Sequence, residues 1–166
     1  SCSMIFARDK QHLYQSFSND ADYLYQGHGD DYNLGKMSIQ CGRRNDALKF
    51  WTLWKSVGSN GLAEIVDYQY QLSETAHNYM EEHPDYTVYS KSPSVTICFN
   101  YKGIDPKILC TALYEQRQIM VGYGMQGEAT FIRSVAVNTN NEEADMLEFF
   151  EVLEVFVEQN EDALSL

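Results

Sequence analysis

The chain has 166 residues, which suffices for one domain, or for the end of one domain joined to a second, smaller one. Hydrophobic residues make up 44% of it and aromatic residues 13%, as in ordinary globular proteins, and no apolar run approaches the length of a membrane span. The formal net charge of -12 would repel phosphate backbones, which argues against nucleic-acid binding.

The N-terminal region is expected to hold little regular structure. Residues 2–7 predict a short strand, and residues 9–17 predict a turn with one helical stretch. Residues 19–36 are rich in Asp, Gly, Asn, Gln and Tyr and have no apolar period, which predicts an exposed, mobile loop. A structureless loop this long in a compact domain is typical of functional lids or of disorder. The first residues contain no basic segment followed by a long apolar stretch, so the sequence shows no signal peptide.

The cysteines argue against a zinc site. Cys2, Cys41, Cys98 and Cys110 show no paired spacing, and the four histidines do not interleave with them as zinc ligands would. Scattered cysteines without a signal sequence favour reduced thiols and a cytoplasmic location.

Residues 40–58 join a cysteine-glycine turn to an aromatic helix. The apolar positions recur at three- and four-residue spacings and share one helical face, which we expect to be buried in a core or an interface: Ala47, Phe50, Trp51, Trp54 and Val57. Gly58 and Gly61 stand where such a helix would end. Gly42, in the turn before the helix, would let backbone N–H groups approach an anion, although a purely structural turn explains it equally well.

The remaining elements alternate between helix and strand. A helical stripe runs from Leu62 to Met80 and ends before Pro84, and strands are predicted at 86–89 and 95–101. Asp105 and Pro106 are typical of a helix start. Extended structure follows at 120–123 and 130–137. Asn140 or Asn141 is expected to cap a last helix whose inward residues are Leu147, Phe150, Leu153 and Val157. This order predicts a small α+β layer of antiparallel strands covered by helices.

Two features of the second half bear on chemistry. The glycines of residues 122–127 spell a dinucleotide-binding fingerprint, but a strand follows where that motif needs a helix, which argues against nucleotide binding. Arg133 alternates in phase with Phe131, Val135 and Val137, so a guanidinium shares a face with apolar residues and needs a partner. That partner is either a carboxylate in a structural ion pair or a ligand carboxylate bound by two parallel hydrogen bonds.

Three segments resemble the group II pyridoxal-phosphate decarboxylases that act on glutamate, cysteine sulfinate and aromatic amino acids. The first is the Cys-Gly-Arg turn and Lys-Phe-Trp helix of residues 41–51. The second is Asp20-Ala21-Asp22-Tyr23-Leu24-Tyr25, with Asp22 in place of the usual glycine. The third combines Val-Gly-Tyr and Gln-Gly at 121–127 with the Phe-Ile-Arg strand at 131–133.

The resemblance implies a fold and a set of boundaries. The fold would be α+β, the C-terminal small domain of a fold-type-I enzyme similar to aspartate aminotransferase, together with the end of its large domain. Residues 1–36 would end the cofactor-binding large domain, with a mobile catalytic loop at 19–36. Residues 37–61 would form the phosphate-side turn and linking helix, and residues 62–158 the small domain. Residues 159–166, outside the resemblance, would be an acidic tail.

The resemblance also implies roles for particular residues. Tyr23 would be the proton donor, Arg133 would bind the substrate α-carboxylate, and Cys41 and Gly42 would reach the phosphate of pyridoxal 5'-phosphate from a neighbouring subunit. The substrate would be an acidic amino acid: glutamate, aspartate or cysteine sulfinate. The alternative for Tyr23 is a loop residue packed on the surface. The alternatives for the function are an aldehyde-forming or transaminating enzyme and a non-catalytic dimerisation or regulatory module.

The lysine that binds the cofactor in this family lies in a His-Lys motif shortly before the position of Cys2. None of Lys10, Lys36, Lys49 and Lys55 has that context. The resemblance therefore implies that a missing N-terminal part of the same enzyme supplies the lysine and that the complete enzyme is a homodimer with its active site at the subunit interface. It implies a small-molecule substrate, no metal, no nucleic acid and no membrane partner, and we expect the 166-residue chain alone to be inactive.

Overall fold

The computed structural model describes residues 4–17, 44–90 and 93–164. It divides into two compact units, Ser1–Ser59 and Asn60–Leu166, which are described separately. In the first unit, helix α1 spans Lys10–Phe17, in agreement with the helical stretch expected there. Residues 4–7 are not in a strand, so the strand predicted for residues 2–7 is wrong over its described part. These residues are exposed and have no neighbouring strand to pair with in the described structure.

Helix α2 spans Asp46–Glu82 and contains a break at Gly58, whose φ of 73° and ψ of 179° lie in a region that essentially only glycine adopts. The predicted end of the aromatic helix therefore falls at Gly58, whereas Gly61 is helical. The face expected to be buried is open to solvent in the first unit, with Trp51 54% and Trp54 47% exposed. Trp54 is nevertheless held in place, because its indole nitrogen donates to Ser59 Oγ at 3.0 Å and its ring meets Phe50 edge-on.

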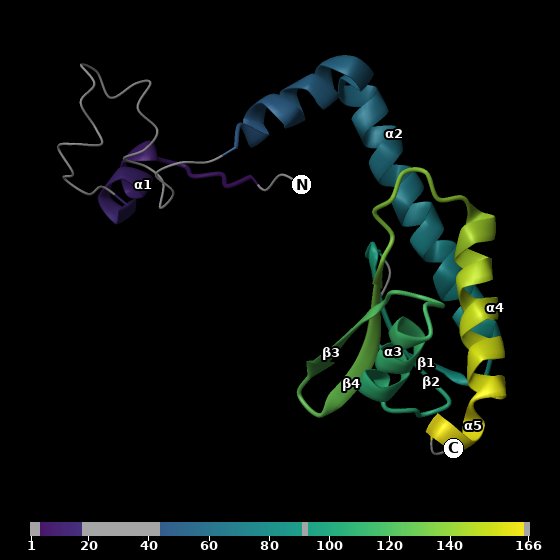
Figure 1. Ribbon diagram of the computed structural model, residues 1–166. Helices are drawn as coiled ribbons and strands as arrows, with labels where there is room; N and C mark the ends of the chain where they lie inside the picture. Colours follow the sequence, from purple (N-terminus) through teal and green to yellow (C-terminus); the bar gives the residue numbers. More distant parts are fainter. Residues whose placement is uncertain (1–3, 18–43, 91–92, 165–166) are drawn as a thin grey trace. The chain divides into compact units, whose positions relative to one another are not determined.

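The second unit is built on a four-stranded antiparallel sheet, labelled in Figure 1. Its strands are β1 (Tyr86–Val88), β2 (Thr96–Tyr101), β3 (Gly122–Gln126) and β4 (Ala129–Val135), in the order β1-β2-β4-β3. Strands β3 and β4 form a hairpin with the two-residue loop Gly127-Glu128. Gly127 has a φ of 61°, as the first loop position of a type II′ turn requires. The strand that follows residues 122–126 also excludes the dinucleotide-binding motif.

Helices α3 (Pro106–Glu115), α4 (Glu143–Gln159) and α5 (Glu161–Leu164) complete the unit. Asp105 caps α3 as expected, and its carboxylate accepts a hydrogen bond from the backbone N–H of Lys107 at 2.8 Å. The predicted cap of α4 is wrong, since Glu142 occupies that position in a capping box with Asp145. The side chains of Asn138 and Asn141 bond each other in the preceding turn instead.

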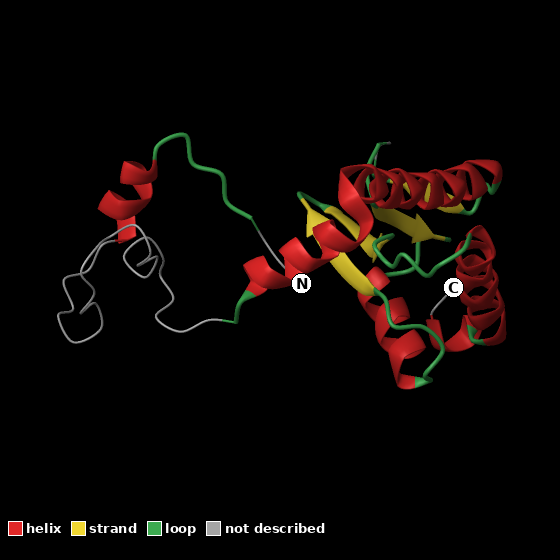
Figure 2. Ribbon diagram, turned by 90° about the horizontal axis from the view of Figure 1, so that it is seen from above, coloured by secondary structure: helices red, strands yellow, loops and turns green. Residues whose placement is uncertain are grey.

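One hydrophobic core joins the helices to a single face of the sheet, and Figure 2 shows the strands as a layer beside the helices. Its fully buried members come from α2, β2, α3, β4 and α4 and include Leu72, Phe99, Leu109, Ile132, Phe150 and Leu153. The α+β fold expected from the sequence is confirmed. Leu147, expected to face inward, is 38% exposed, because the buried stripe of α4 begins at Met146.

A polar cluster at one end of the core links α2, β1 and α4. Tyr79 and Tyr86 both donate their hydroxyl groups to Oε1 of Glu154, at 3.0 and 2.7 Å. Burial and the Glu154 carboxylate raise the pKa of Tyr79 to about 12, and the same causes raise the pKa of Tyr86 still further. Burial and nearby carboxylates also raise the pKa of Tyr101 to about 12.

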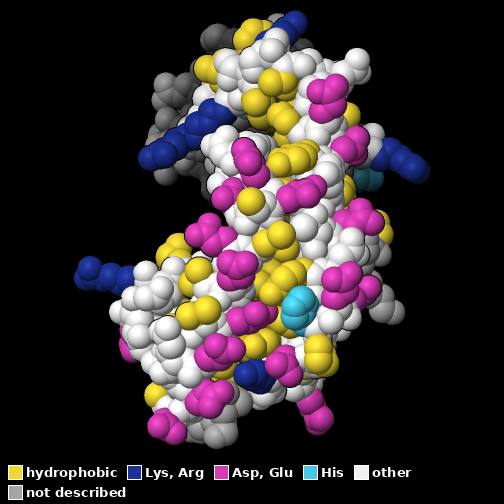
Figure 3. Space-filling view, turned by 90° about the vertical axis from the view of Figure 1, so that its right-hand side faces the viewer, with side chains coloured by type: hydrophobic (Ala, Val, Ile, Leu, Met, Phe, Trp, Pro, Cys, Tyr) yellow, Lys and Arg dark blue, Asp and Glu magenta, His cyan; other side chains and the backbone are white. Residues whose placement is uncertain are grey.

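Among the charged side chains on the side where α4 lies, acidic ones predominate over basic ones (Figure 3). Within residues 4–17, 44–90 and 93–164, no three His, Cys, Asp or Glu side chains gather as metal ligands. No helix in the described ranges combines the length and apolar character needed to cross a membrane.

Candidate functional site

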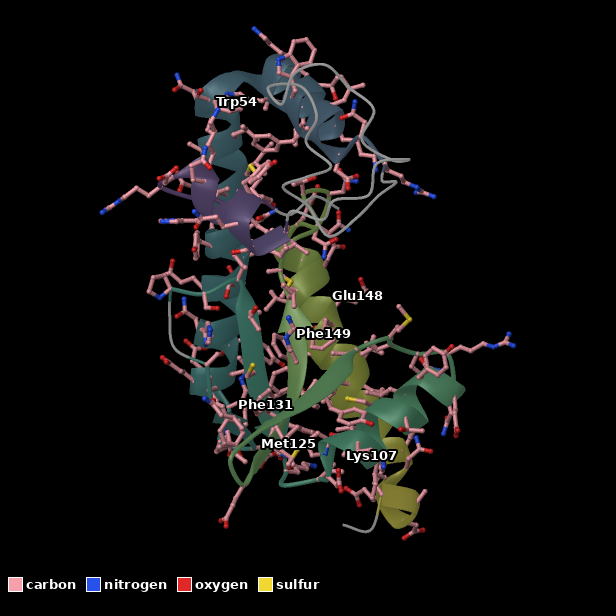
Figure 4. All side chains as sticks on the ribbon, turned by 90° about the vertical axis from the view of Figure 1, so that its left-hand side faces the viewer. Trp54, Lys107, Met125, Phe131, Glu148 and Phe149 are labelled. Carbon is pink, nitrogen blue, oxygen red and sulfur yellow. The ribbon has the colours of Figure 1, made fainter. Side chains whose placement is uncertain are left out.

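In residues 44–90 and 93–164, the helices cover one face of the sheet, and no described helix covers the other. On β4, Ile132 and Ala136 are buried against the helices, while the alternate residues Phe131, Arg133 and Val135 belong to the opposite face. Figure 4 views the molecule from the side of the sheet and labels Phe131 on β4. We call the face that carries these three residues, together with Cys98, Gly122 and Gly124 of the paired strands, the open face.

Arg133 is the charged group at the centre of the open face. Its cross-strand neighbours are Cys98 on β2 and Gly122 on β3. Its side chain is exposed, and no hydrogen bond or ion pair joins it to another described residue. The apolar face that the sequence assigned to Arg133 is thus the face that no described helix covers, and among the described residues its guanidinium has no protein partner.

Cys98 lies half-buried beside Arg133, and the pKa of its thiol responds to the charge on this face. Burial raises the pKa of the Cys98 thiol, and the positive charge of Arg133 acts against that rise. Arg133 therefore creates a positive potential over the open face, whose other residues are uncharged. In a chain with a net charge of -12, such a spot is suited to an anion with two oxygens, because the planar guanidinium donates in pairs.

On the β3 side of Arg133, the open face consists of glycines. Edge strand β3 contributes Gly122 opposite Arg133 and Gly124 opposite Phe131. The Phe131 ring lies over Gly124, since a Cβ atom there would stand 2.9 Å from Phe131 Cε2. Tyr89 contacts the same ring, with the two ring centroids 6.0 Å apart. The aromatic pair and the bare backbone of β3 thus belong to the same face as Arg133.

The described structure contains one of the four site residues expected from the sequence. Arg133 is on the open face, whereas Tyr23, Cys41 and Gly42 lie outside the described residues, so it does not show whether they come together with Arg133. Sequence reasoning missed Gly122 and Cys98 as neighbours of Arg133, because strand pairing cannot be read from a single strand's alternation. The weak signal was the repeated glycine at every second position of residues 122–124.

The described residues do not themselves form a cradle for pyridoxal phosphate. Lys49 pairs with Asp46 at 2.8 Å on an exposed helix, and Lys55 lies over the Trp51 ring. Lys55 lines a shallow pocket with Trp51 and Trp54, but both lysines are exposed. What the described chain offers is the exposed guanidinium of Arg133, a group whose geometry suits a carboxylate.

Comparison with known proteins agrees with the likeness seen in the sequence. The family model described as the pyridoxal-dependent decarboxylase conserved domain matches residues 1–102. Acidic amino acid decarboxylase GADL1 of Mus musculus is 28% identical over 169 residues, covering 87% of this chain and 30% of that protein. Cysteine sulfinic acid decarboxylase of Mus musculus is 26% identical over 167 residues, covering 87% of this chain and 34% of that protein.

A solved structure shows the same fold. The crystal structure of Oryza sativa TDC with PLP and tryptamine superposes with a TM-score of 0.73 at 18% identity, covering 92% of this chain and 34% of that one. The helix-covered antiparallel sheet is therefore that of a small α+β domain of pyridoxal-phosphate decarboxylases. The chain belongs to the pyridoxal-dependent decarboxylase family. It spans about a third of the length of these relatives.

Proposed function

We propose that the chain is the C-terminal third of a pyridoxal-phosphate decarboxylase that removes the α-carboxylate of an acidic amino acid. Glutamate, aspartate and cysteine sulfinate are the candidate substrates. Family membership supports the reaction class, and relatives named as acidic amino acid and cysteine sulfinic acid decarboxylases support the substrate class. The observation that carries the proposal is the exposed Arg133 guanidinium, without a protein partner in the described chain, on an otherwise uncharged sheet face.

In the proposed mechanism, Arg133 binds the substrate α-carboxylate by two parallel N–H···O hydrogen bonds and so fixes its orientation. Pyridoxal phosphate, when bound, supplies an electron sink for the electron pair released as carbon dioxide leaves. Tyr23 then gives its phenolic proton to the α-carbon. Cys41 and Gly42 would contact the cofactor phosphate. These last three assignments rest on the sequence resemblance.

We also propose that the complete enzyme is a cytoplasmic homodimer, with an N-terminal part that supplies the cofactor lysine. The free thiols Cys98 and Cys110 support a reducing compartment. The exposed apolar stripe of Trp51, Trp54 and Val57 in the first unit supports a subunit contact, because adjacent exposed aromatic residues are typical of interfaces. Sedimentation of the complete polypeptide gives its molecular mass in solution and so tests whether it is a dimer.

The test uses Arg133→Lys in the complete, cofactor-loaded polypeptide. Lysine keeps the charge but loses the two-pronged donor, so affinity for succinate should fall about tenfold, as expected for a lost hydrogen bond to a charged group. Succinate serves as the probe because it carries the carboxylates without a reactive amine. Calorimetry gives the dissociation constant, and thermal melting gives the stability.

The matched control is Arg117→Lys, an exposed arginine beyond the end of α3 and away from the open face. It should change neither quantity. Normal succinate affinity together with a lower melting temperature in Arg133→Lys would assign Arg133 to a structural role instead. A complete, folded and cofactor-loaded polypeptide that released no carbon dioxide from any of the three substrates would favour the non-catalytic module.

A further inference from the structure

The glycines in the described chain fall into groups with different physical reasons. Gly58, Gly103 and Gly127 have positive φ angles that disfavour any other residue. At Gly124 a Cβ atom would stand 2.9 Å from Cε2 of Phe131, so any side chain there would require the ring to move. In each of these positions the fold itself explains the glycine.

Gly122 is explained by neither reason. Its φ lies outside the positive range, and a Cβ atom built on it would meet only the Arg133 carbonyl oxygen, at an ordinary 3.9 Å. Glycine inside a strand weakens that strand, because it loses more backbone entropy on folding and has no side chain to pack. The folded chain as described would therefore accept the Cβ atom of an alanine at 122 and become more stable.

The position of Gly122 suggests what its missing side chain leaves room for. It is the cross-strand partner of Arg133, and the side chains of directly opposed residues stand about 5 Å apart at their Cβ atoms. On its other side Arg133 is flanked by the Cys98 thiol. Because β3 is an edge strand, the bare backbone at Gly122 leaves the guanidinium approachable from the edge of the sheet.

We propose that Gly122 is a specificity-determining residue, which keeps clear the space beside Arg133 where the planar α-carboxylate of the substrate lies. This inference rests on the proposed function, since it requires that Arg133 binds a carboxylate. The carboxylate occupies the volume that any side chain at 122 would take, with its oxygens toward the guanidinium. A residue larger than glycine narrows this space in proportion to its size.

The experiment compares Gly122→Ala and Gly122→Val in the complete, cofactor-loaded polypeptide, again with succinate as the probe. Affinity should fall stepwise, modestly for alanine and about tenfold for valine, which fills more of the space used by a charge-assisted pair. The melting temperature should stay level or rise, because both changes restrict the unfolded chain. Gly124→Ala is the matched control: it adds the same methyl group two residues away and should lower the melting temperature while affecting succinate affinity less than Gly122→Ala does.

The outcomes separate the two proposals. Weak binding in Arg133→Lys with normal binding in both Gly122 variants overturns the role of Gly122 and leaves the proposed function standing. Normal binding in Arg133→Lys overturns the carboxylate site itself. The double variant Arg133→Lys/Gly122→Ala adds an internal check, because residues that act at one site give losses that do not add. Fully additive losses of succinate affinity would show that Gly122 acts at a place other than the Arg133 site.

Discussion

Glu154 is the acceptor that ties α2 and β1 to α4, and its replacement should cost a calculable part of the stability. Glu154→Ala leaves the hydroxyl of Tyr86, a residue only 8% exposed, without its acceptor. An unsatisfied buried hydroxyl costs about 1–3 kcal/mol. Tyr79 is half-buried and can turn toward water, so its loss adds about 1 kcal/mol, the net worth of one hydrogen bond. We expect Glu154→Ala to lower the free energy of unfolding by about 3 kcal/mol in total.

Glu154→Gln separates the hydrogen bonds from the charge. The amide oxygen can still accept from both hydroxyls, so only the charge assistance is lost, and the cost should be about 1 kcal/mol. Urea unfolding of the chain followed by circular dichroism measures both values, provided that the slope with denaturant stays unchanged. Glu148→Gln, on the exposed side of the same helix, is the control and should stay within about 0.5 kcal/mol of the parent. Equal losses for the alanine and glutamine variants would refute the reasoning, since they would show that the acceptor oxygen contributes nothing.

The remaining predictions concern proton transfers. The pKa values of Tyr79 and Tyr101 are about 12 in the folded chain, against an ordinary value of 10.0. Above pH 10 the unfolded state therefore loses these two protons more readily than the folded state does. The contribution of these tyrosines to the free energy of unfolding should be complete below pH 10 and decline between about pH 10 and 12. Urea midpoints that do not change across that window would contradict the burial of these hydroxyls. In the complete enzyme, Tyr23→Phe should keep its succinate affinity but form amine product about 10²–10⁴-fold more slowly, because only the proton donor is lost. An unchanged rate in single-turnover assays would return Tyr23 to surface packing.

The local signals in the sequence predicted the elements of the second unit well. Asp105 and Pro106 specify a helix start by chemistry that needs no tertiary partner, and the structure has α3 beginning there. The alternation around Ile97 and Phe99 likewise predicted β2, because both residues are buried on one face. Such signals act within a few residues, so they are visible in one chain without knowledge of its fold.

The sequence did not reveal which side of the sheet the helices cover. Residues 130–137 are apolar on both faces, and Arg133 was expected among buried neighbours, whereas Ile132 is the buried residue and Arg133 lies on the open face. The choice is made by α3 and α4, which pack from distant parts of the chain. The role proposed for Gly122 was hidden for the same reason, since it depends on the pairing of Gly122 with Arg133.

The hairpin loop Gly127-Glu128 determines more than the reversal of the chain. Side chains of a strand alternate, so a shift of one residue in the pairing of β4 would exchange its two faces. Arg133 would then turn toward the helices, and Ile132 would be left in water. The two-residue loop, whose first position needs the positive φ of Gly127, prevents that slip. A turn six residues away thus sets the face on which the guanidinium lies without touching it. If Arg133 binds a carboxylate as proposed, an insertion that shifted the pairing by one residue would abolish that binding while every residue of the site stayed in the sequence.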